Sequence, residues 1–206
     1  MSPKYTLTYF NARGAAEPCR FMFAVAGVEY EDKRVKSEDW PAIKADQPFG
    51  QLPVLTVDGK KIPQSKAIFR YVAREHGFYG ANSWEAALID IVFETCDEFT
   101  FPLMKWYLEK DPAKKEEEKK NVLEVIPKIF EKLEKCLIHN KNGDGWFVGD
   151  KLSLADFVFL SLHERLALYA TVEDVDQFPK LKGLVARLTA QKEIAEWIAK
   201  RPKTEN

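Results

Sequence analysis

The sequence has 206 residues with 31 basic and 32 acidic side chains, so its formal net charge at pH 7 is −1. Hydrophobic residues make up 46% and charged residues 31%, which indicates a soluble globular protein of one or two domains. Because positive and negative charges nearly balance, we expect neither nucleic acid nor a membrane surface as a partner.

The cysteines and the apolar runs indicate the compartment. Cys19, Cys96 and Cys136 are far apart and fit neither a disulfide framework nor a metal-ligand spacing. The first residues lack the apolar core of a signal peptide, and no apolar run is long enough to cross a bilayer. We therefore expect a cytoplasmic protein.

The first part of the chain predicts strands and a helix in alternation. Residues 5–10 are rich in β-forming side chains and alternate, and residues 30–35 predict a second strand in which Tyr30, Asp32 and Arg34 alternate with other residues. Residues 15–26 between them carry an apolar stripe at helical spacing. Pro18 is compatible with this helix because it falls in the first turn. Gly27 is expected to end the helix.

Residues 54–63 predict a β-hairpin. Two short strands flank Asp58-Gly59, a pair that readily adopts the positive φ angles of a tight turn. Pro63 has no amide hydrogen, so the second strand is expected at an edge of the sheet. Ser65 is expected to cap the next helix, residues 66–76, because its hydroxyl can accept a hydrogen bond from a backbone amide.

Beyond a polar break, the pattern is helical. Residues 84–109 predict one long helix, and Asp111-Pro112 starts another. Residues 122–137 are apolar at helical spacing, with an expected kink at Pro127. Ser153 and Asp156 then stand at the spacing of a capping box, which favours a structural role for Asp156 over a catalytic one. The expected domains are residues 1–80 and residues 83–206.

These elements resemble a known architecture. A β-α-β unit, a connector and a β-β-α unit, with a proline before the third strand, resemble the thioredoxin fold. Joined to an all-helical domain, the whole chain resembles a cytosolic glutathione S-transferase. The fold class implied is an α+β thioredoxin-like N-terminal domain with a mixed four-stranded sheet, plus an all-α C-terminal domain. The landmarks are Tyr9, Trp40, Lys44, Gln51-Leu52-Pro53, Gln64-Ser65 and the cap from Ser153 to Asp156.

The segment from Leu7 to Asn11 with Arg13-Gly14, and the ending Arg201-Pro202, are most similar to the sigma class. That class includes the glutathione-dependent prostaglandin D synthases and many invertebrate enzymes.

The resemblance implies a glutathione site. Pro53 would be a cis proline, which lets the amide and carbonyl of Leu52 pair with the cysteinyl unit of glutathione. Gln64 and Ser65 would hold the γ-glutamyl end, where a helix N-terminus also suits a carboxylate. The glycyl carboxylate would meet three residues, Trp40, Lys44 and Gln51. Taken singly, Lys44 would be a surface lysine and Trp40 a cover for the core.

The resemblance makes Tyr9 the catalytic residue. Phe10-Asn11-Ala12-Arg13 follows it without a cysteine, which argues against dithiol redox chemistry. A free thiol has a pKa of about 8.5, and lowering it by about two units requires roughly 2.7 kcal/mol of preference for the anion. One hydrogen bond to a charged group contributes about 1.5–3 kcal/mol, and the helix that begins at Ala15 about 0.3–1 kcal/mol. These magnitudes suffice without a metal ion, and we expect none.

The resemblance also implies a second-substrate pocket and a homodimer. The pocket would use Phe10, Gly14, Ala15, Thr100, Leu103 and Met104, although the helical positions are as compatible with a core. Either Asp97 or Glu98 would reach the glutathione amino group in the partner subunit. Phe49, an aromatic in a polar loop, would insert into the partner or pack on its own domain.

Three functions are compatible with these features. The leading hypothesis is transfer of glutathione, as co-substrate, to electrophilic hydrophobic small molecules. The second is glutathione-dependent isomerisation of a prostaglandin endoperoxide, which is weakened because prostaglandin synthases of this class carry an arginine where this chain has Ala15. The third is a non-catalytic carrier of haem or other apolar ligands, or a crystallin-like protein.

Overall fold

The computed structural model describes residues 3–167 and 177–204 of the chain. Its contacts divide the chain into two compact units, one made of Met1–Phe78 with Gln191–Asn206 and the other of Tyr79–Ala190. The first is called the sheet unit below, and the second the helical unit.

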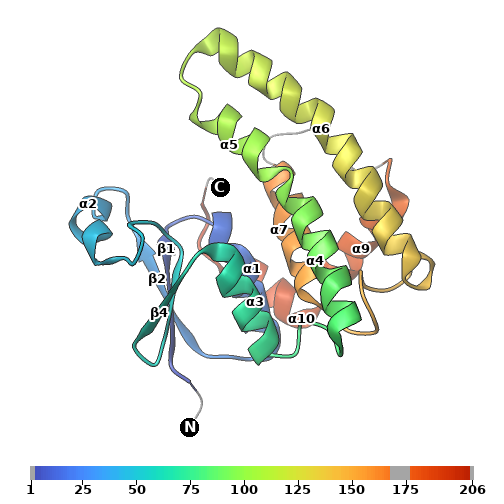
Figure 1. Ribbon diagram of the computed structural model, residues 1–206, viewed down its shortest axis with the longest axis horizontal. Coiled ribbons are helices and arrows are strands. Elements are labelled where there is room, and N and C mark those ends of the chain that lie inside the picture. The colour runs from blue at the N-terminus through green and yellow to red at the C-terminus, as the bar shows by residue number, and fades with distance from the viewer. Residues whose placement is uncertain (1–2, 168–176, 205–206) are drawn as a thin grey trace. The chain divides into compact units, whose positions relative to one another are not determined.

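The sheet unit contains a mixed four-stranded sheet (Figure 1). The strands are β1 (Tyr5–Phe10), β2 (Tyr30–Val35), β3 (Val54–Val57) and β4 (Lys60–Pro63), in the order β2-β1-β3-β4. β1 runs parallel to β2 and antiparallel to β3, which pairs antiparallel with β4. The predicted strands and hairpin are thus confirmed, and Pro63 lies on an edge strand.

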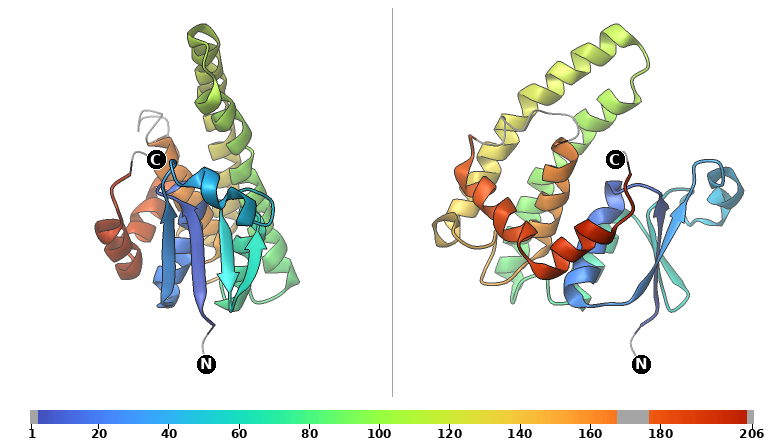
Figure 2. Two further views of the ribbon diagram at one scale, coloured as in Figure 1. Left: turned by 90° about the vertical axis from the view of Figure 1, so that its left-hand side faces the viewer. Right: turned by 180° about the vertical axis from the view of Figure 1, so that it is seen from behind.

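Helices α1 (Glu17–Ala26) and α3 (Ser65–Glu75) cover one face of this sheet, and the connector with α2 (Trp40–Ile43) and the 3-10 turn η2 (Lys44–Asp46) lies on its other side (Figure 2). Gly27 ends α1 with φ +63°, as expected. The α-helix begins later than predicted because residues Gly14–Ala16 form a 3-10 turn, η1, in which Gly14 has φ +39°.

The prediction that Ser65 caps α3 is wrong. Gln64 is the N-cap residue, with φ 73° and ψ 109°, and no side chain makes a capping hydrogen bond. The chain turns from β4 into α3 at Gln64, which has the positive φ, and Ser65 is already the first residue of the helix. The Ser65 hydroxyl is therefore not used to cap its own helix.

The last helix, α10 (Lys192–Lys200), belongs to the sheet unit by its contacts, although the division expected from the sequence assigned it to the helical domain. It packs on α1, and Ile194 and Trp197 are its buried residues. Packing against α1 explains why residues distant in sequence join the first unit.

The helical unit is built around α7 (Leu154–Leu166), which is buried over most of its length and packs on α4 (Ser83–Asp97). The other elements are α5 (Thr100–Leu108), α6 (Pro112–His139), η3 (Lys141–Gly143) and α9 (Pro179–Thr189). Among the described residues, no helix combines the length and apolar composition of a membrane span.

One predicted helix is divided in the structure. The expected helix 84–109 is interrupted between α4 and α5, where Pro102 has no amide hydrogen to donate to the carbonyl of Glu98. By contrast, α6 continues through Pro127 as one helix, with Val122 and Phe130 buried on either side of it, and the kink at Pro127 stays a prediction.

The predicted capping box is confirmed at the start of α7. Asp156 accepts hydrogen bonds from the Ser153 amide at 2.9 Å, the Ser153 hydroxyl at 2.8 Å and the Phe147 amide at 3.0 Å. The carboxyl is fully buried, and this burial raises its pKa to about 6, against the lowering effect of those hydrogen bonds. Asp156 therefore has a structural role.

Candidate active site

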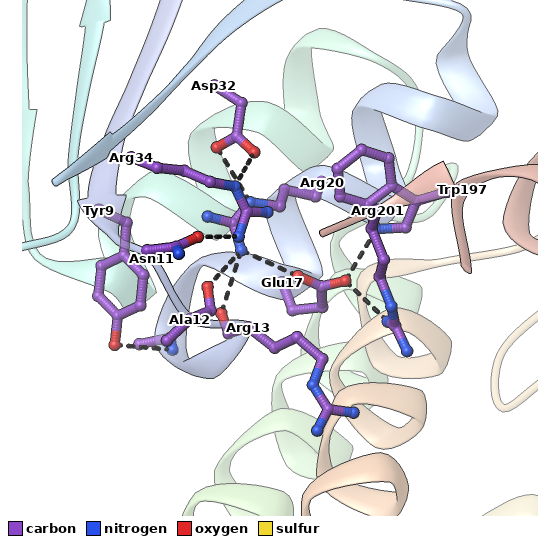
Figure 3. A network of polar contacts seen from close by, with 11 residues as sticks. Tyr9, Asn11, Ala12, Arg13, Glu17, Arg20, Asp32, Arg34, Trp197 and Arg201 are labelled. Atoms are coloured by element: carbon purple, nitrogen blue, oxygen red, sulfur yellow. Dashed lines mark hydrogen bonds and ion pairs between the residues drawn. The ribbon is translucent and has the colours of Figure 1, made fainter. Parts of the chain in front are cut away.

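Tyr9 stands near the end of β1, and its side chain is half-buried. Its hydroxyl oxygen accepts a hydrogen bond from the Ala15 amide at 3.1 Å (Figure 3). A phenolic hydroxyl can accept and donate at the same time. Because the oxygen is engaged by Ala15, the hydroxyl hydrogen can be donated to a further group.

Gly14 allows the loop after β1 to approach the Tyr9 ring. A Cβ at Gly14 would lie 2.6 Å from the Tyr9 hydroxyl oxygen and 2.9 Å from a ring carbon, closer than a methyl group can approach. With φ +39°, the position is also in the left-handed region that favours glycine. Glycine at this position therefore keeps the Tyr9 hydroxyl in place.

The strand register brings three of the predicted residues together. Thr8 of β1 pairs with Val54 of β3, and Val54 pairs with Pro63 of β4. Extending both registers by one residue puts Tyr9 opposite Pro53, and Pro53 opposite Gln64. Thus three adjacent strands present Tyr9, Pro53 and Gln64 at the same end of the sheet.

The peptide bond between Leu52 and Pro53 is cis, as the sequence resemblance implied. Pro53 is buried and Leu52 is half-buried, whereas Gln51 is exposed. Gln64 is also exposed, and Ser65, the first residue of α3, is half-buried. The main-chain groups of Leu52 and the polar side chain of Gln64 therefore lie at the sheet end that carries Tyr9.

Trp40 and Lys44 lie in the connector. The Trp40 ring contacts Phe10 edge-on with 5.4 Å between ring centroids, and Phe10 contacts Tyr9 in the same way at 5.7 Å. Lys44 is exposed, and its aliphatic chain runs beside Gly50, where a Cβ would lie 3.6 Å from the Lys44 Cε. An aromatic row thus joins the connector to Tyr9.

The remaining predicted site residues of the helical unit lie on α4 and α5. Glu98 forms an ion pair with Lys132 at 2.6 Å, and Asp97 is half-buried. On α5, Thr100 is half-buried and Met104 is 40% exposed. Leu103 is only 3% exposed, so it belongs to the core of the protein.

A buried polar network next to the site was missed from the sequence. Arg20 and Glu17 on α1 form an ion pair at 2.9 Å, and Arg20 also pairs with Asp32 of β2 at 3.1 Å (Figure 3). Glu17 further accepts hydrogen bonds from Trp197 and Arg201, each at 2.8 Å. The available signal was an acid and a base three residues apart at the start of an apolar helix.

Within residues 3–167 and 177–204, no group of three or more His, Cys, Asp or Glu side chains could hold a metal ion.

Two family models match most of the chain. The chain matches the family model of the glutathione S-transferase N-terminal domain over residues 5–74 and that of the C-terminal domain over residues 97–201. It therefore belongs to the glutathione S-transferase family.

Relatives with three different names are similar over almost the whole chain. S-crystallin SL11 of Nototodarus sloanii is 40% identical over 98% of both chains, and glutathione S-transferase S1 of Drosophila melanogaster is 40% identical over 98% of this chain and 80% of its own. The solved structure of prostaglandin synthase D of Nilaparvata lugens is 37% identical with a TM-score of 0.88, covering 98% of this chain and all of its own.

Proposed function

We propose that this protein is a glutathione transferase in which the Tyr9 hydroxyl stabilises the glutathione thiolate for attack on electrophilic, hydrophobic small molecules. The observation that carries the proposal is the register that sets Tyr9, Pro53 and Gln64 side by side at one end of the sheet. The Tyr9 oxygen accepts from the Ala15 amide, which leaves its hydrogen for the sulfur.

Glutathione fits this end of the sheet as an extended ligand. The main-chain groups of Leu52 pair with its cysteinyl unit, and Gln64, with the N-terminus of α3 at Ser65, binds the γ-glutamyl carboxylate. The glycyl carboxylate is bound by Lys44 through its charge and by Trp40 through its indole N–H, with Gln51 nearby. The electrophile lies against Phe10, next to Tyr9.

The active form in this proposal is a cytoplasmic homodimer of sigma-class type, with a role in detoxification. An acidic residue of α4 binds the amino group of glutathione held by the partner subunit. Asp97 and Glu98, at the end of α4, are the two candidates for this contact. Phe49, which is 61% exposed, is the residue that inserts into the partner.

A second candidate is isomerisation of a prostaglandin endoperoxide by the same thiolate, with glutathione returned unchanged. It is favoured by the similarity to the prostaglandin synthase structure. Ala15 in place of arginine argues against it. Incubation with the endoperoxide and glutathione separates the two functions, because isomerisation yields a product without glutathione attached.

The S-crystallin relative raises the alternative of a non-catalytic protein. A structural or ligand-carrying role would place no requirement on a tyrosine hydroxyl held by a backbone amide, or on a glycine that makes room for it. These two features favour catalysis.

The direct test is Tyr9→Phe, assayed with glutathione and an activated aryl chloride. Loss of one hydrogen bond to a charged group is worth about 1.5–3 kcal/mol, so turnover should fall roughly ten- to hundredfold while glutathione affinity stays nearly unchanged. The matched control is Tyr71→Phe on α3, which should retain turnover. Wild-type turnover in Tyr9→Phe would refute the role of Tyr9.

A further inference from the structure

Arg20 is fully buried and uses its guanidinium to join several segments of the sheet unit. Its Nε donates to Asp32 of β2 at 3.1 Å, and its Nη1 donates to Glu17 at 2.9 Å. The same Nη1 lies 2.7 Å from the carbonyl oxygen of Ala12 and 3.3 Å from that of Arg13. One buried side chain therefore binds two successive carbonyls of the loop after β1.

This loop leads directly to the proposed catalytic group. Arg13 is followed by Gly14, where an added Cβ would clash with the Tyr9 side chain, and by Ala15, whose amide donates to the Tyr9 hydroxyl at 3.1 Å. The Arg13 carbonyl also accepts from the Ala16 amide at 3.2 Å, which closes the turn. A shift of the Ala12 and Arg13 carbonyls would therefore move the Ala15 amide relative to Tyr9.

The network continues from Arg20 to the last helix. Glu17 is 1% exposed, and one of its carboxylate oxygens accepts from Trp197 on α10 and from Arg201 just after it. The second oxygen accepts from Arg20, so the carboxylate is bound on both sides. A buried carboxylate held by three donors fixes Arg20 in one position.

We propose that Arg20, held by Glu17 and α10, is a positioning residue for thiolate stabilisation: it fixes the loop after β1 so that the Ala15 amide stays on the Tyr9 hydroxyl oxygen. The inference rests on the proposed function of Tyr9. When the Tyr9 oxygen accepts from Ala15, its O–H becomes a stronger donor to a thiolate, because successive hydrogen bonds polarise one another.

The test is Arg20→Lys, which keeps the charge but loses the planar fork that serves Asp32 and the loop carbonyls together. The readout is kcat/KM against pH. We expect the inflection that reports the glutathione thiol to move to higher pH and kcat/KM below it to fall about two- to fivefold, with KM for glutathione unchanged. At high pH, where the thiol is ionised in both proteins, kcat/KM of the variant should reach that of the wild type.

The matched control is Arg187→Lys in the helical unit. Arg187 also donates to two loop carbonyls, those of Gly143 at 2.9 Å and Gly145 at 2.8 Å, and this loop is a different segment from the one that carries Ala15. This variant should lose thermal stability and keep the wild-type inflection. A purely structural role for Arg20 would give the same result in Arg20→Lys: lower stability with an unshifted inflection, which would overturn the proposal.

Two further variants keep the test decisive. If Arg20→Lys does not fold, Trp197→Phe is the alternative variant: it removes the indole donor to Glu17, together with part of the ring, and should shift the inflection in the same direction by a smaller amount. An unshifted inflection in this variant contradicts the proposal. In a double-mutant cycle, Arg20→Lys should add no shift in a Tyr9→Phe background. An unshifted inflection in Tyr9→Phe would refute the proposed function. If the inflection shifts in Tyr9→Phe but not in Arg20→Lys, the function of Tyr9 stands and only the positioning role of Arg20 is refuted.

Discussion

Gly14 is in the left-handed region and in close contact with the Tyr9 ring, so two separate effects require glycine there. At Gly27, which ends α1 with φ +63°, only the backbone conformation favours glycine, because an added Cβ would meet no neighbouring atom within 4 Å. Comparing the two glycines separates strain from displacement of Tyr9.

We therefore predict that Gly14→Ala and Gly27→Ala each destabilise the protein by about 1–2 kcal/mol, since an alanine at positive φ is strained. Only Gly14→Ala should also reduce turnover with glutathione, because its methyl group would push the Tyr9 hydroxyl away. Thermal unfolding and steady-state kinetics of both variants measure this. Full turnover in folded Gly14→Ala would show that the position of Tyr9 is not critical.

Among the single residues, Tyr9, Pro53 and Gln64 were predicted as site residues from the sequence, whereas Arg20 was not. Tyr9, Pro53 and Gln64 lie near strand ends, next to residues typical of turns, and the family resemblance assigns each of them a role. Glu17 and Arg20 look like an ordinary pair of charges on one helical face. No local pattern predicts that Trp197, 180 residues along the chain, donates to Glu17.

At the start of α7, the carboxyl group of Asp156 forms part of the helix cap and is fully buried. Burial raises the pKa of Asp156 from its ordinary value of 3.8 to about 6. Between these two values, the folded protein binds a proton that the unfolded chain does not. The contribution of Asp156 to stability is therefore most favourable below this window and is lost as the pH rises through it.

We predict that the stability advantage of the wild type over Asp156→Asn is largest near pH 4 and decreases by up to about 3 kcal/mol by pH 6.5. Urea unfolding at several pH values measures the difference. Asn82→Ala serves as a control, because the Asn82 cap accepts from Trp84 and Glu85 and is neutral. The Asn82→Ala variant should lose about 0.5–2 kcal/mol of unfolding free energy, and this loss should not change with pH between 4 and 6.5. A constant difference for Asp156→Asn would contradict the assignment.

The existence of most helices could be predicted, whereas their boundaries depended on interactions that periodicity does not describe. Ser65 has the chemistry of an N-cap, but Gln64 takes the non-helical conformation instead. Pro102 interrupts hydrogen bonding in a stretch whose apolar pattern is continuous. Pro127 also lacks the donor, but α6 is a single helix through it, with Val122 and Phe130 buried on either side.

For the whole molecule, the domain division was harder to predict than the fold class. The strand order and hairpin follow from the sequence and its resemblance, and the structure agrees. The grouping of α10 with the sheet unit depends on Ile194 and Trp197 packing on α1, which is visible only in three dimensions.

The proposed homodimer predicts a role for Phe49. Truncating an aromatic anchor in an interface costs at least about 2 kcal/mol, so Phe49→Ala should weaken dimerisation about thirtyfold or more. Sedimentation at a series of concentrations measures this. Leu108→Ala is the control, since Leu108 is 65% exposed at the end of α5 and has no proposed interface role. An unchanged dissociation constant for Phe49→Ala would remove Phe49 from the interface.

The central claim, that Tyr9 stabilises the glutathione thiolate, is tested most directly by titrating the thiolate absorbance of bound glutathione against pH. We predict that the wild type binds glutathione with a thiol pKa about two units below the ordinary value of about 8.5, and that Tyr9→Phe raises it again by about one to two units. The same thiol pKa in both proteins, or an ordinary one in the wild type, would contradict the account.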